Sequence, residues 1–413
     1  VESSYTGKLQ VNVVTRENVP VRDATVTIAA SDSPNNIIER LTTNSSGQTE
    51  TIELPAPPIE LSLNEANTTR PYTTYNIRIE ALGYETEFIE NAEILPDVLA
   101  IQNVRLTSKN ASLTEDIMIP DHTLYGEYPP KVPEEEIKPV NEPGEIVLSR
   151  VVVPEIIVVH DGIPSDSSAQ NYYVNYRDYI KNVASSEIYA TWPTATIEAN
   201  VLAIMSFTLN RVYTEWYRNK GYDFTITSST AYDQKWIYGR NIFESISLVV
   251  DNIFDQYLSR PDVRQPILTQ YCDGKRVTCP NWLSQWGSCN LGEQGFGTLE
   301  IIRNYYGDDM YINTAEQISG IPASWPGYDL TIGASGQKVM QMQEQLDTIA
   351  RVYTAIPRVS ADGVFGEGTQ ASVRAFQKIF DLPQTGVVDF STWYKISQIY
   401  VGITRIAEGI PRG

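Results

Sequence analysis

A segment rich in proline and glutamate restricts the fold of this chain more than any other feature. Residues 126–145 read GEYPPKVPEEEIKPVNEPGE. Repeated prolines interrupt helices and sheets, and this composition has too little apolar surface to form a core of its own. We therefore predict an exposed linker over residues 109–149, with folded units on both sides. Such a linker is open to proteolysis, although its composition fits a passive spacer equally well.

The length and charge of the chain limit its architecture and its partners. The 413 residues correspond to two to four domains at roughly 150 residues per domain. With 51 acidic and 31 basic residues, the net charge is -20, which disfavours nucleic acid and anionic membrane surfaces as partners. No apolar stretch approaches the ~20 residues that span a bilayer, and the first residues, VESSYTGKLQ, do not resemble a signal peptide. We expect no membrane insertion.

The regions beside the linker differ in their hydrophobic periodicity. Residues 1–108 contain alternating segments such as KLQVNVV, ATVTIAA and YNIRIEALGYE, which are typical of an antiparallel β-sandwich. Residues 150–322 begin with the apolar strands of VVVPEIIVVHDG and continue with helices and mixed elements, which indicates an α+β domain. In residues 323–413 each half pairs a glycine turn with an amphipathic helix. There we predict a small all-α domain with Phe365, Phe376 and Trp393 in its core.

A glutamate on an apolar helical face is the main candidate for chemistry. Ile180, Val183, Ala184 and Glu187 recur at i, i+3, i+4 and i+7 in NYRDYIKNVASSEIYATWP, so they share one face of a helix. If that face is buried, the carboxyl group loses hydration and its pKa rises, which suits a general acid. The alternative is a glutamate at the end of a helix that reaches solvent.

Two further segments follow this helix. The stretch TATIEANVLAIMSFTLNRVY begins after Pro193 and is apolar on more than one side, so we predict a buried central helix. In YDFTITSSTAYDQKWIYG, the residues Gln234, Trp236 and Tyr238 alternate along a predicted strand and loop. Aromatic and amide groups on one wall suit a sugar-binding cleft, although a half-buried strand produces the same pattern.

The cysteines and histidines do not predict a metal site. The spacing of Cys272, Cys279 and Cys289 differs from zinc-binding patterns, and we expect a structural or incidental role for them. His122 and His160 are the only histidines in the sequence, too few for a three-histidine zinc site. We therefore predict that the protein uses no metal or other cofactor.

Six motifs in the central region carry a family resemblance. VASSE, WP, IEANVLAIMSF, DFTITSSTAYDQKWIYG, LSQWGS and GTLEIIRNYYGDDMYI follow one another over about residues 172–316. In this order they resemble the motifs of the SpoIID/LytB family of peptidoglycan-cleaving enzymes. The C-terminal stretch, with GxxGxxV, DGVFG, FQ and TW, is similar to peptidoglycan-binding type 1 modules. The N-terminal β-domain resembles carboxypeptidase-regulatory-like domains, and the whole arrangement is similar to that of clostridial spore cortex-lytic enzymes.

This resemblance implies a catalytic role for Glu187, which matches the family's motif glutamate. Glu187 is then the acid of a lytic transglycosylase, which protonates the glycosidic oxygen between N-acetylmuramic acid and N-acetylglucosamine. The muramoyl C6 hydroxyl closes onto C1 to give a 1,6-anhydro end, so one carboxyl group serves both steps. The residues that we expect on the substrate side of the cleft are Trp192, Gln234, Tyr238, Ser284 and Gln285.

The chain departs from the family pattern at two positions. Met205 stands where the family commonly has a helix arginine, and Cys279 falls roughly where a histidine precedes the SQYG segment. Substrate contacts made by those side chains in the family are therefore not transferred to this protein.

The resemblance also implies a zymogen. In the similar enzymes the N-terminal β-domain is a prosequence, which a subtilisin-like germination protease of the Csp type removes. Residues 109–149 are the region in which we expect the cut. The expected substrate is spore cortex peptidoglycan, and the expected location is at or near the cortex and coat, outside the spore core.

Two alternative functions stay open. An N-acetylmuramoyl-L-alanine amidase is disfavoured, because only His160 would remain after removal of the linker. A non-catalytic wall-binding protein, built from a sandwich and a binding module, predicts instead that Glu187→Gln leaves function intact.

Overall fold

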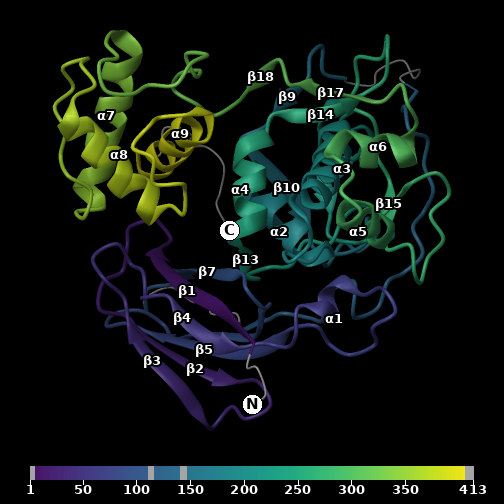
Figure 1. The fold of residues 1–413 in the computed structure, drawn as a ribbon, viewed down its shortest axis with the longest axis horizontal. Coiled ribbons are helices and arrows are strands. Elements are labelled where there is room, and N and C mark those ends of the chain that lie inside the picture. The colour runs from purple at the N-terminus through teal and green to yellow at the C-terminus, as the bar shows by residue number, and fades with distance from the viewer. Residues whose placement is uncertain (1–4, 110–115, 140–146, 405–413) are drawn as a thin grey trace.

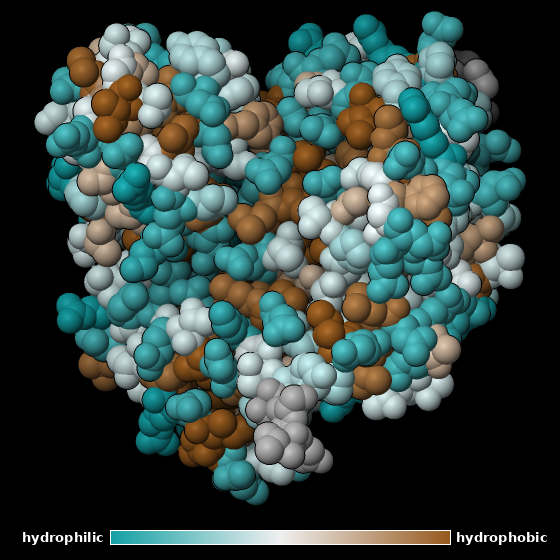
Figure 2. Space-filling view, viewed as in Figure 1, coloured by the Kyte–Doolittle hydropathy of each residue, from teal (hydrophilic) through white to brown (hydrophobic). Residues whose placement is uncertain are grey.

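The computed structural model describes residues 5–109, 116–139 and 147–404. They form a β-rich N-terminal domain, a central α+β domain and a helical C-terminal module (Figure 1). On the face shown in Figure 2, a hollow separates the C-terminal module from the central domain. The predicted multidomain architecture, with a sheet-rich N-terminal region and a helical C-terminal region, is confirmed.

The N-terminal domain is a sandwich of two sheets. One sheet, in the order given, contains β13 (Ile242–Phe243), β7 (Leu99–Leu106), β1 (Thr6–Thr15) and β4 (Ile52–Pro55). The other contains β3 (Ile37–Thr42), β2 (Thr25–Ala30), β5 (Thr73–Glu80), β6 (Glu87–Ile94) and β8 (Ile117–Met118). A short helix, α1 (Glu60–Leu63), follows β4.

The strand pairing differs in part from the antiparallel sandwich predicted. β1 pairs in parallel with β7, and β6 pairs in parallel with β8. The reason is that the chain passes from one sheet to the other between β6 and β7, so β7 enters beside β1 in the same direction. Alternating burial along β1 places Leu9, Val11 and Val13 in the core between the sheets.

The central domain contributes a strand to this sandwich. β13 belongs to the central domain in sequence, yet it pairs antiparallel with β7 at the sheet edge. Beside this pair, Arg240 Nη2 lies 2.8 Å from Glu93 Oε2, and both side chains are buried. Asn241 accepts a hydrogen bond from Glu93 N at 3.0 Å and donates one to Glu93 O at 2.9 Å. A shared sheet edge and a buried ion pair therefore join the two domains.

The central domain is built around one long buried helix, as predicted. α3 (Thr194–Tyr213) begins after its N-cap residue, Pro193. The helices that pack against α3 are α2 (Tyr176–Glu187), α4 (Glu244–Ile253), α5 (Gln285–Glu293) and α6 (Thr298–Tyr306). Among the helices that the structure describes, none combines the length and the apolar character needed to cross a membrane.

Short strands complete the central domain. The three-stranded sheet has the order β11 (Asn171–Asn175), β10 (Ile156–His160) and β12 (Ile226–Thr227). Three two-stranded sheets pair β14 (Gln256–Ser259) with β17 (Tyr311–Thr314), β15 (Tyr271–Cys272) with β16 (Leu283–Ser284), and β18 (Gln317–Ile318) with β9 (Val152–Val153).

The C-terminal module contains a repeated helix-and-turn unit. Its helices are α7 (Gln337–Val352), α8 (Glu367–Ile379) and α9 (Phe390–Thr404). A buried glutamine in each of the first two helices bonds the following glycine turn and a threonine of the next helix. The two sets are Gln343 with Gly363 and Thr369, and Gln377 with Gly386 and Thr392. Phe365, Phe376 and Trp393 lie in the core, as predicted.

The α9 helix fixes the C-terminal module to the central domain. Arg177 Nη2 donates to Tyr394 O at 2.9 Å, and Ser391 Oγ donates to Asp251 O at 3.2 Å. Asp251 also pairs with Arg177 and Lys181 at 3.3 and 2.8 Å. Burial opposes ionisation of Asp251, but the neighbouring cations lower its pKa to about 2. The interface therefore contains a charged carboxylate with its partners in place.

We expect Arg240→Ala to weaken the attachment of the N-terminal domain. Glu93 would remain buried without its cation, which costs about 3–5 kcal/mol. Arg78→Ala is the matched control, because the Arg78–Glu80 pair is exposed and such pairs contribute about 0–1 kcal/mol. The free energy of unfolding in urea, and the protection of β6 and β13 from hydrogen exchange in the folded protein, measure both changes. Equal effects of the two variants would contradict this prediction.

Candidate active site

Glu187 is the last residue of α2 and lies at the centre of the candidate site. Asn175 caps the start of this helix with its side chain. The predicted apolar face is confirmed, because Ile180, Val183 and Ala184 are fully buried. Glu187 is fully buried as well, so the alternative of a solvent-exposed glutamate is wrong for this structure.

The Glu187 carboxyl group has one backbone donor and several polar neighbours. Glu187 Oε1 accepts a hydrogen bond from Lys235 N at 2.7 Å, whereas Oε2 has no partner that meets hydrogen-bond geometry among the described residues. Burial raises the pKa of Glu187, and Lys131, the Tyr271 hydroxyl and the Lys235 N–H oppose this rise. The predicted direction of the pKa shift is confirmed. A carboxyl group with a raised pKa keeps its proton at higher pH, as a general acid requires.

The loop that contacts Glu187 is fastened to α2. Asn182 Oδ1 accepts a hydrogen bond from Ile237 N at 2.9 Å, and Asn182 Nδ2 donates to Ile237 O at 2.7 Å. Gln234 is fully buried, and its Oε1 accepts a hydrogen bond from the Tyr179 hydroxyl at 3.0 Å. In this structure Gln234 therefore stabilises the position of the loop against α2.

The predicted common wall of Gln234, Trp236 and Tyr238 is not formed. Within residues 222–239, all of which are described, the structure has a strand only at β12, so these side chains do not alternate across a sheet. Gln234 points into the core, whereas Trp236 and Tyr238 pack on Tyr172 with ring centroids 5.1 and 4.8 Å away. Tyr238 is 38% exposed, so solvent reaches this aromatic group there.

Residues 119–138, which we call the covering segment, lie over Glu187. Lys131 Nζ donates to Asp233 O at 3.0 Å and lies 4.5 Å from the centroid of the Tyr271 ring. Lys131 is buried, and its charge favours the ionised form of Glu187. The covering segment therefore places a cation beside the candidate catalytic acid.

The covering segment also bonds to the backbone on both sides of Glu187. Thr123 Oγ1 donates to Ser186 O at 2.7 Å, and His122 Nε2 lies 3.3 Å from Ile188 O. Burial holds the pKa of His122 well below its usual value, which favours the neutral ring. These two contacts fix the segment against the end of α2.

Glutamine side chains of the central domain contribute to holding the rest of the covering segment. Gln270 bonds Val132 O and Glu134 N, both at 2.9 Å. Gln265 bonds Lys138 N at 2.9 Å and Lys138 O at 3.0 Å. An extended, proline-rich chain has few N–H groups to satisfy. Backbone bonds add to the side-chain amides, because Val132 N donates to Ala231 O at 2.7 Å and Glu136 O accepts from Leu268 N at 2.9 Å. The prediction of an exposed linker is therefore wrong in part: His122, Tyr128 and Lys131 are buried. Residues 129, 130, 132, 133, 135 and 137 of the covering segment are exposed, as a linker would be.

A loop closed by a disulfide also holds the covering segment in place. Cys272 and Cys279 form the disulfide, a pairing that the sequence analysis did not predict. Within this loop, Arg276 donates to the backbone carbonyls of residues 123–125 at 2.7–3.1 Å. Cys289 is free and buried, and burial raises the pKa of its thiol. The expected structural or incidental role of the cysteines is met by Cys272 and Cys279, which close this loop.

The other predicted substrate residues lie in two neighbouring places. Trp192 is buried under the N-terminal domain, where its Nε1 donates to Ser62 O at 2.8 Å. Ser284 caps α5 by accepting a hydrogen bond from Gly287 N at 2.9 Å. Gln285 is fully buried, and its amide atoms have no hydrogen-bond partner among the described residues. Substrate binding by these residues stays a prediction.

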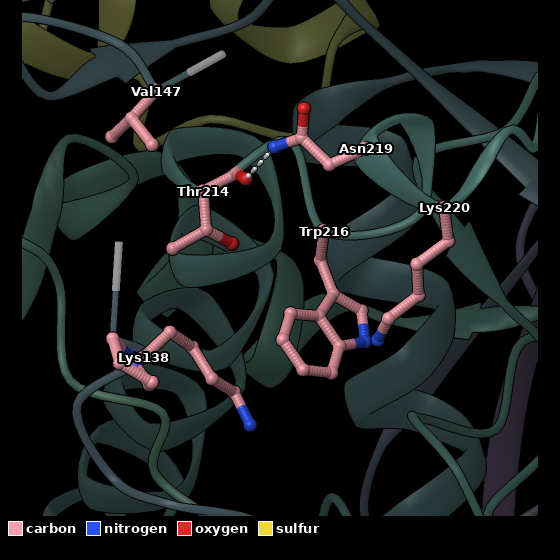
Figure 3. Close-up of a pocket in the computed structure, with 7 residues that line it drawn as sticks. Lys138, Val147, Thr214, Trp216, Asn219 and Lys220 are labelled. Carbon is pink, nitrogen blue, oxygen red and sulfur yellow. Dashed lines mark hydrogen bonds between the residues drawn. The ribbon is translucent and has the colours of Figure 1, made fainter. Parts of the chain in front are cut away.

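A small cavity lies at the end of the covering segment (Figure 3). The Lys138 and Lys220 ammonium groups lie 4.3 and 2.9 Å from the centroid of the Trp216 ring. The cavity volume is about 40 Å³, which is room for roughly one water molecule and not for a sugar ring. The lining residues are Lys138, Pro139, Val147, Thr214, Trp216, Asn219 and Lys220. We interpret it as part of the anchor of the covering segment.

Both histidines have structural contacts. His160 Nδ1 lies 2.8 Å from Asn171 Oδ1, and its ring stacks on Phe224 with centroids 4.4 Å apart. His122 belongs to the covering segment. Within the described residues, no three His, Cys, Asp or Glu side chains are grouped as a metal site would require.

Sequence reasoning missed Tyr128, Lys131 and Tyr271, which all interact with Glu187. The first two lie in a segment whose composition resembles a solvated linker. Tyr271 lies 84 residues after Glu187, next to a cysteine whose pairing was not predicted. No local pattern marks any of the three, because their proximity to Glu187 arises only from tertiary packing.

Comparison with known proteins supports one part of this organisation. Residues 335–396 match the family model described as "Putative peptidoglycan binding domain". Among solved structures, the SleB N-terminal domain is 30% identical and covers 19% of this chain and 99% of its own, with a TM-score of 0.17. No curated protein matches the chain.

Two other solved structures are less similar in sequence. The Bacillus anthracis TIE protein is 13% identical and covers 25% of this chain and 17% of its own, with a TM-score of 0.18. The 3-chlorocatechol 1,2-dioxygenase of Rhodococcus opacus 1CP is 16% identical and covers 26% of this chain and 60% of its own, with a TM-score of 0.17. None of these TM-scores indicates a shared fold over the whole chain. The family match supports a cell-wall-related role, with peptidoglycan as a partner.

We expect Lys131→Met to raise the pKa of Glu187 further. Lys131 favours the carboxylate, so its removal stabilises the protonated form and increases the protonated fraction at neutral pH. Infrared titration of the full chain, with Glu187→Gln to identify the carboxyl band, measures the change. Lys138→Met is the control, because the Lys138 ammonium pairs with Glu134. An unchanged or lowered pKa in Lys131→Met would contradict the assigned contact.

Proposed function

We propose that this protein is the zymogen of a lytic transglycosylase that cleaves spore cortex peptidoglycan, similar in organisation to the cortex-lytic enzyme SleC. The observation that carries this proposal is the Glu187 carboxyl group, which is buried at the end of α2 and has a pKa raised by burial. The match of residues 335–396 to a peptidoglycan-binding family supports the choice of substrate. The SpoIID-like character of the central domain rests on the sequence motifs around Glu187.

The proposed reaction needs one carboxyl group. Glu187 donates its proton to the glycosidic oxygen between N-acetylmuramic acid and N-acetylglucosamine, and the bond from that oxygen to C1 breaks. The muramoyl C6 hydroxyl then attacks C1, and the Glu187 carboxylate takes the hydroxyl proton, which leaves a 1,6-anhydro end. Between the two steps the Lys235 N–H stabilises the carboxylate. The second carboxyl group of an ordinary glycosidase is unnecessary, because the sugar supplies its own nucleophile.

The covering segment supports the proposal of a zymogen. Lys131 and Tyr128 lie against Glu187 and are themselves buried, so a glycan strand cannot reach the carboxyl group while they are in place. We propose that a subtilisin-like germination protease of the Csp type cuts within residues 109–149 at the spore cortex or coat. A cut in the part of this region that follows residue 138 separates the covering segment from the central domain and allows the segment to leave. The N-terminal domain also covers Trp192, a proposed substrate contact.

A cut alone does not remove the contacts that hold the N-terminal domain. The paired strands β7 and β13 and the buried Glu93–Arg240 pair lie outside the region in which we expect the cut. Full activity therefore requires dissociation of the N-terminal domain as well as proteolysis. We propose that these contacts delay activation until the cleaved N-terminal domain has dissociated.

We expect Glu187→Gln to abolish cleavage of glycan strands by the processed protein. Loss of a general acid costs about 10²–10⁴-fold in rate. Muropeptide mass spectrometry of digested cortex, with formation of 1,6-anhydro-muramoyl ends as the measure, tests this. Glu293→Gln, an exposed carboxyl group in the same domain, is the control and retains activity. Full activity of Glu187→Gln would favour a non-catalytic wall-binding protein, and free peptides as the main product would favour an amidase.

A synthetic peptide with the sequence of residues 119–138 should inhibit the processed protein when added in trans. It restores the contacts of Lys131 and the hydrogen bonds of Thr123 and Val132. The same peptide with Lys131→Glu should inhibit more weakly, because its charge repels the Glu187 carboxylate. Initial rates of cortex digestion measure both peptides. Equal inhibition by the two, or none, would show that the covering segment is not the inhibitory element.

A further inference from the structure

We propose that Tyr271 is a positioning residue for Glu187. The Tyr271 hydroxyl donates a hydrogen bond to Glu187 Oε2 and so orients the carboxyl group for both proton transfers. The proton stays on the tyrosine throughout, so Tyr271 takes no part in bond breaking. This inference deepens the proposed function and rests on Glu187 being the acid.

The first argument is the distribution of donors around the carboxyl group. Glu187 Oε1 accepts from Lys235 N at 2.7 Å. Glu187 Oε2 and the Tyr271 hydroxyl are both buried, and neither has a partner that meets hydrogen-bond geometry among the described residues, so each is an unsatisfied polar atom. The two groups interact with each other. Water does not reach either buried group, so a hydrogen bond between the hydroxyl and the carboxyl oxygen would stabilise both.

The second argument is the rigid support of the tyrosine. Tyr271 lies in β15, where it pairs with Leu283 of β16. The next residue, Cys272, is held by the disulfide to Cys279. Nearby, the Tyr306 hydroxyl donates to Gln270 O at 2.8 Å. A side chain on such a support keeps one orientation, which is what a group that aims a catalytic carboxyl requires.

The third argument is that the contact survives removal of the covering segment. Two of the groups that face Glu187, Lys131 and Tyr128, leave with that segment, whereas Tyr271 belongs to the central domain. The titratable groups that face Glu187 are Tyr128 and Lys131 from the covering segment, Tyr179 from α2, Lys235 from the adjoining loop and Tyr271 from β15. In the processed protein, Tyr271 is therefore a side-chain donor that still holds the carboxyl group.

The test compares Tyr271→Phe with Tyr306→Phe in the full chain by infrared titration of the Glu187 carboxyl group. Tyr271→Phe removes a donor to the charged form, so the Glu187 pKa should move upwards. Tyr306→Phe removes a buried hydroxyl that bonds Gln270 O and should leave the Glu187 pKa unchanged. Equal shifts, or no shift, in the two variants would overturn the proposal.

A second measurement separates a positioning role from a structural one. In the processed protein, Tyr271→Phe should move the alkaline limb of the pH–rate profile upwards, because a general acid with a higher pKa keeps its proton to higher pH. Incorporation of 3,5-difluorotyrosine at Tyr271 preserves the ring and makes the hydroxyl a stronger donor, so the Glu187 pKa should move downwards. A downward shift supports the proposal even if Tyr271→Phe fails to fold, and an unchanged pKa overturns it.

The outcomes distinguish this inference from the proposed function. The pKa of Glu187 is measured without reference to any reaction, whereas the activity of Glu187→Gln decides whether Glu187 is the acid. An inactive Glu187→Gln with an unchanged pKa in Tyr271→Phe overturns only the role of Tyr271. If the Glu187 pKa shifts in Tyr271→Phe but Glu187→Gln is active, the contact between Tyr271 and Glu187 is supported. The assignment of Glu187 as the catalytic acid is then overturned.

Discussion

The burial of a single carboxyl group controls the organisation of this protein. Glu187 ends a helix whose apolar face lies in the core, so its side chain has no route to water while the covering segment is in place. A buried carboxyl group is costly when charged, and the structure offsets this cost with a backbone donor from Lys235 and a cation from Lys131. Lys235 belongs to the central domain, whereas Lys131 belongs to the covering segment that precedes this domain in the chain. The environment of the acid therefore depends on both.

The N-terminal domain and the covering segment act on the central domain by different means. The domain shares a sheet edge with β13 and has the buried Glu93–Arg240 pair. The covering segment has no core of its own. It is held by side-chain amides, by the disulfide-closed loop around Arg276, by the Arg211–Glu134 ion pair and by backbone hydrogen bonds. The segment lies against Glu187, and the domain holds the segment's N-terminal end close by. In the activation that we propose, proteolysis and dissociation are two separate steps.

Local sequence patterns were sufficient for features that depend on nearby residues. The helical face with Glu187, the central helix after Pro193 and the core of the C-terminal module follow from apolar periodicity, and the structure contains them. The predicted wall of Gln234, Trp236 and Tyr238 failed, because alternation implies a shared face only in a strand, and this segment is a loop. The parallel pairing of β1 with β7 also could not be predicted, because it depends on how the chain passes between sheets.

The sequence by itself determined the helical face that carries Glu187, since periodicity sets which side chains share a face. Whether that face is buried, and with it the direction of the Glu187 pKa shift, depended on tertiary packing, because only burial disfavours the charged form. Only the tertiary structure decided what lies against that carboxyl group. The proline-rich segment that contains Tyr128 and Lys131 has the composition of a solvated chain, yet these two side chains are buried, because the central domain supplies the surface and hydrogen-bond partners that the segment lacks. Contacts between residues so far apart in sequence depend on surfaces that exist only after folding, and no local pattern encodes them.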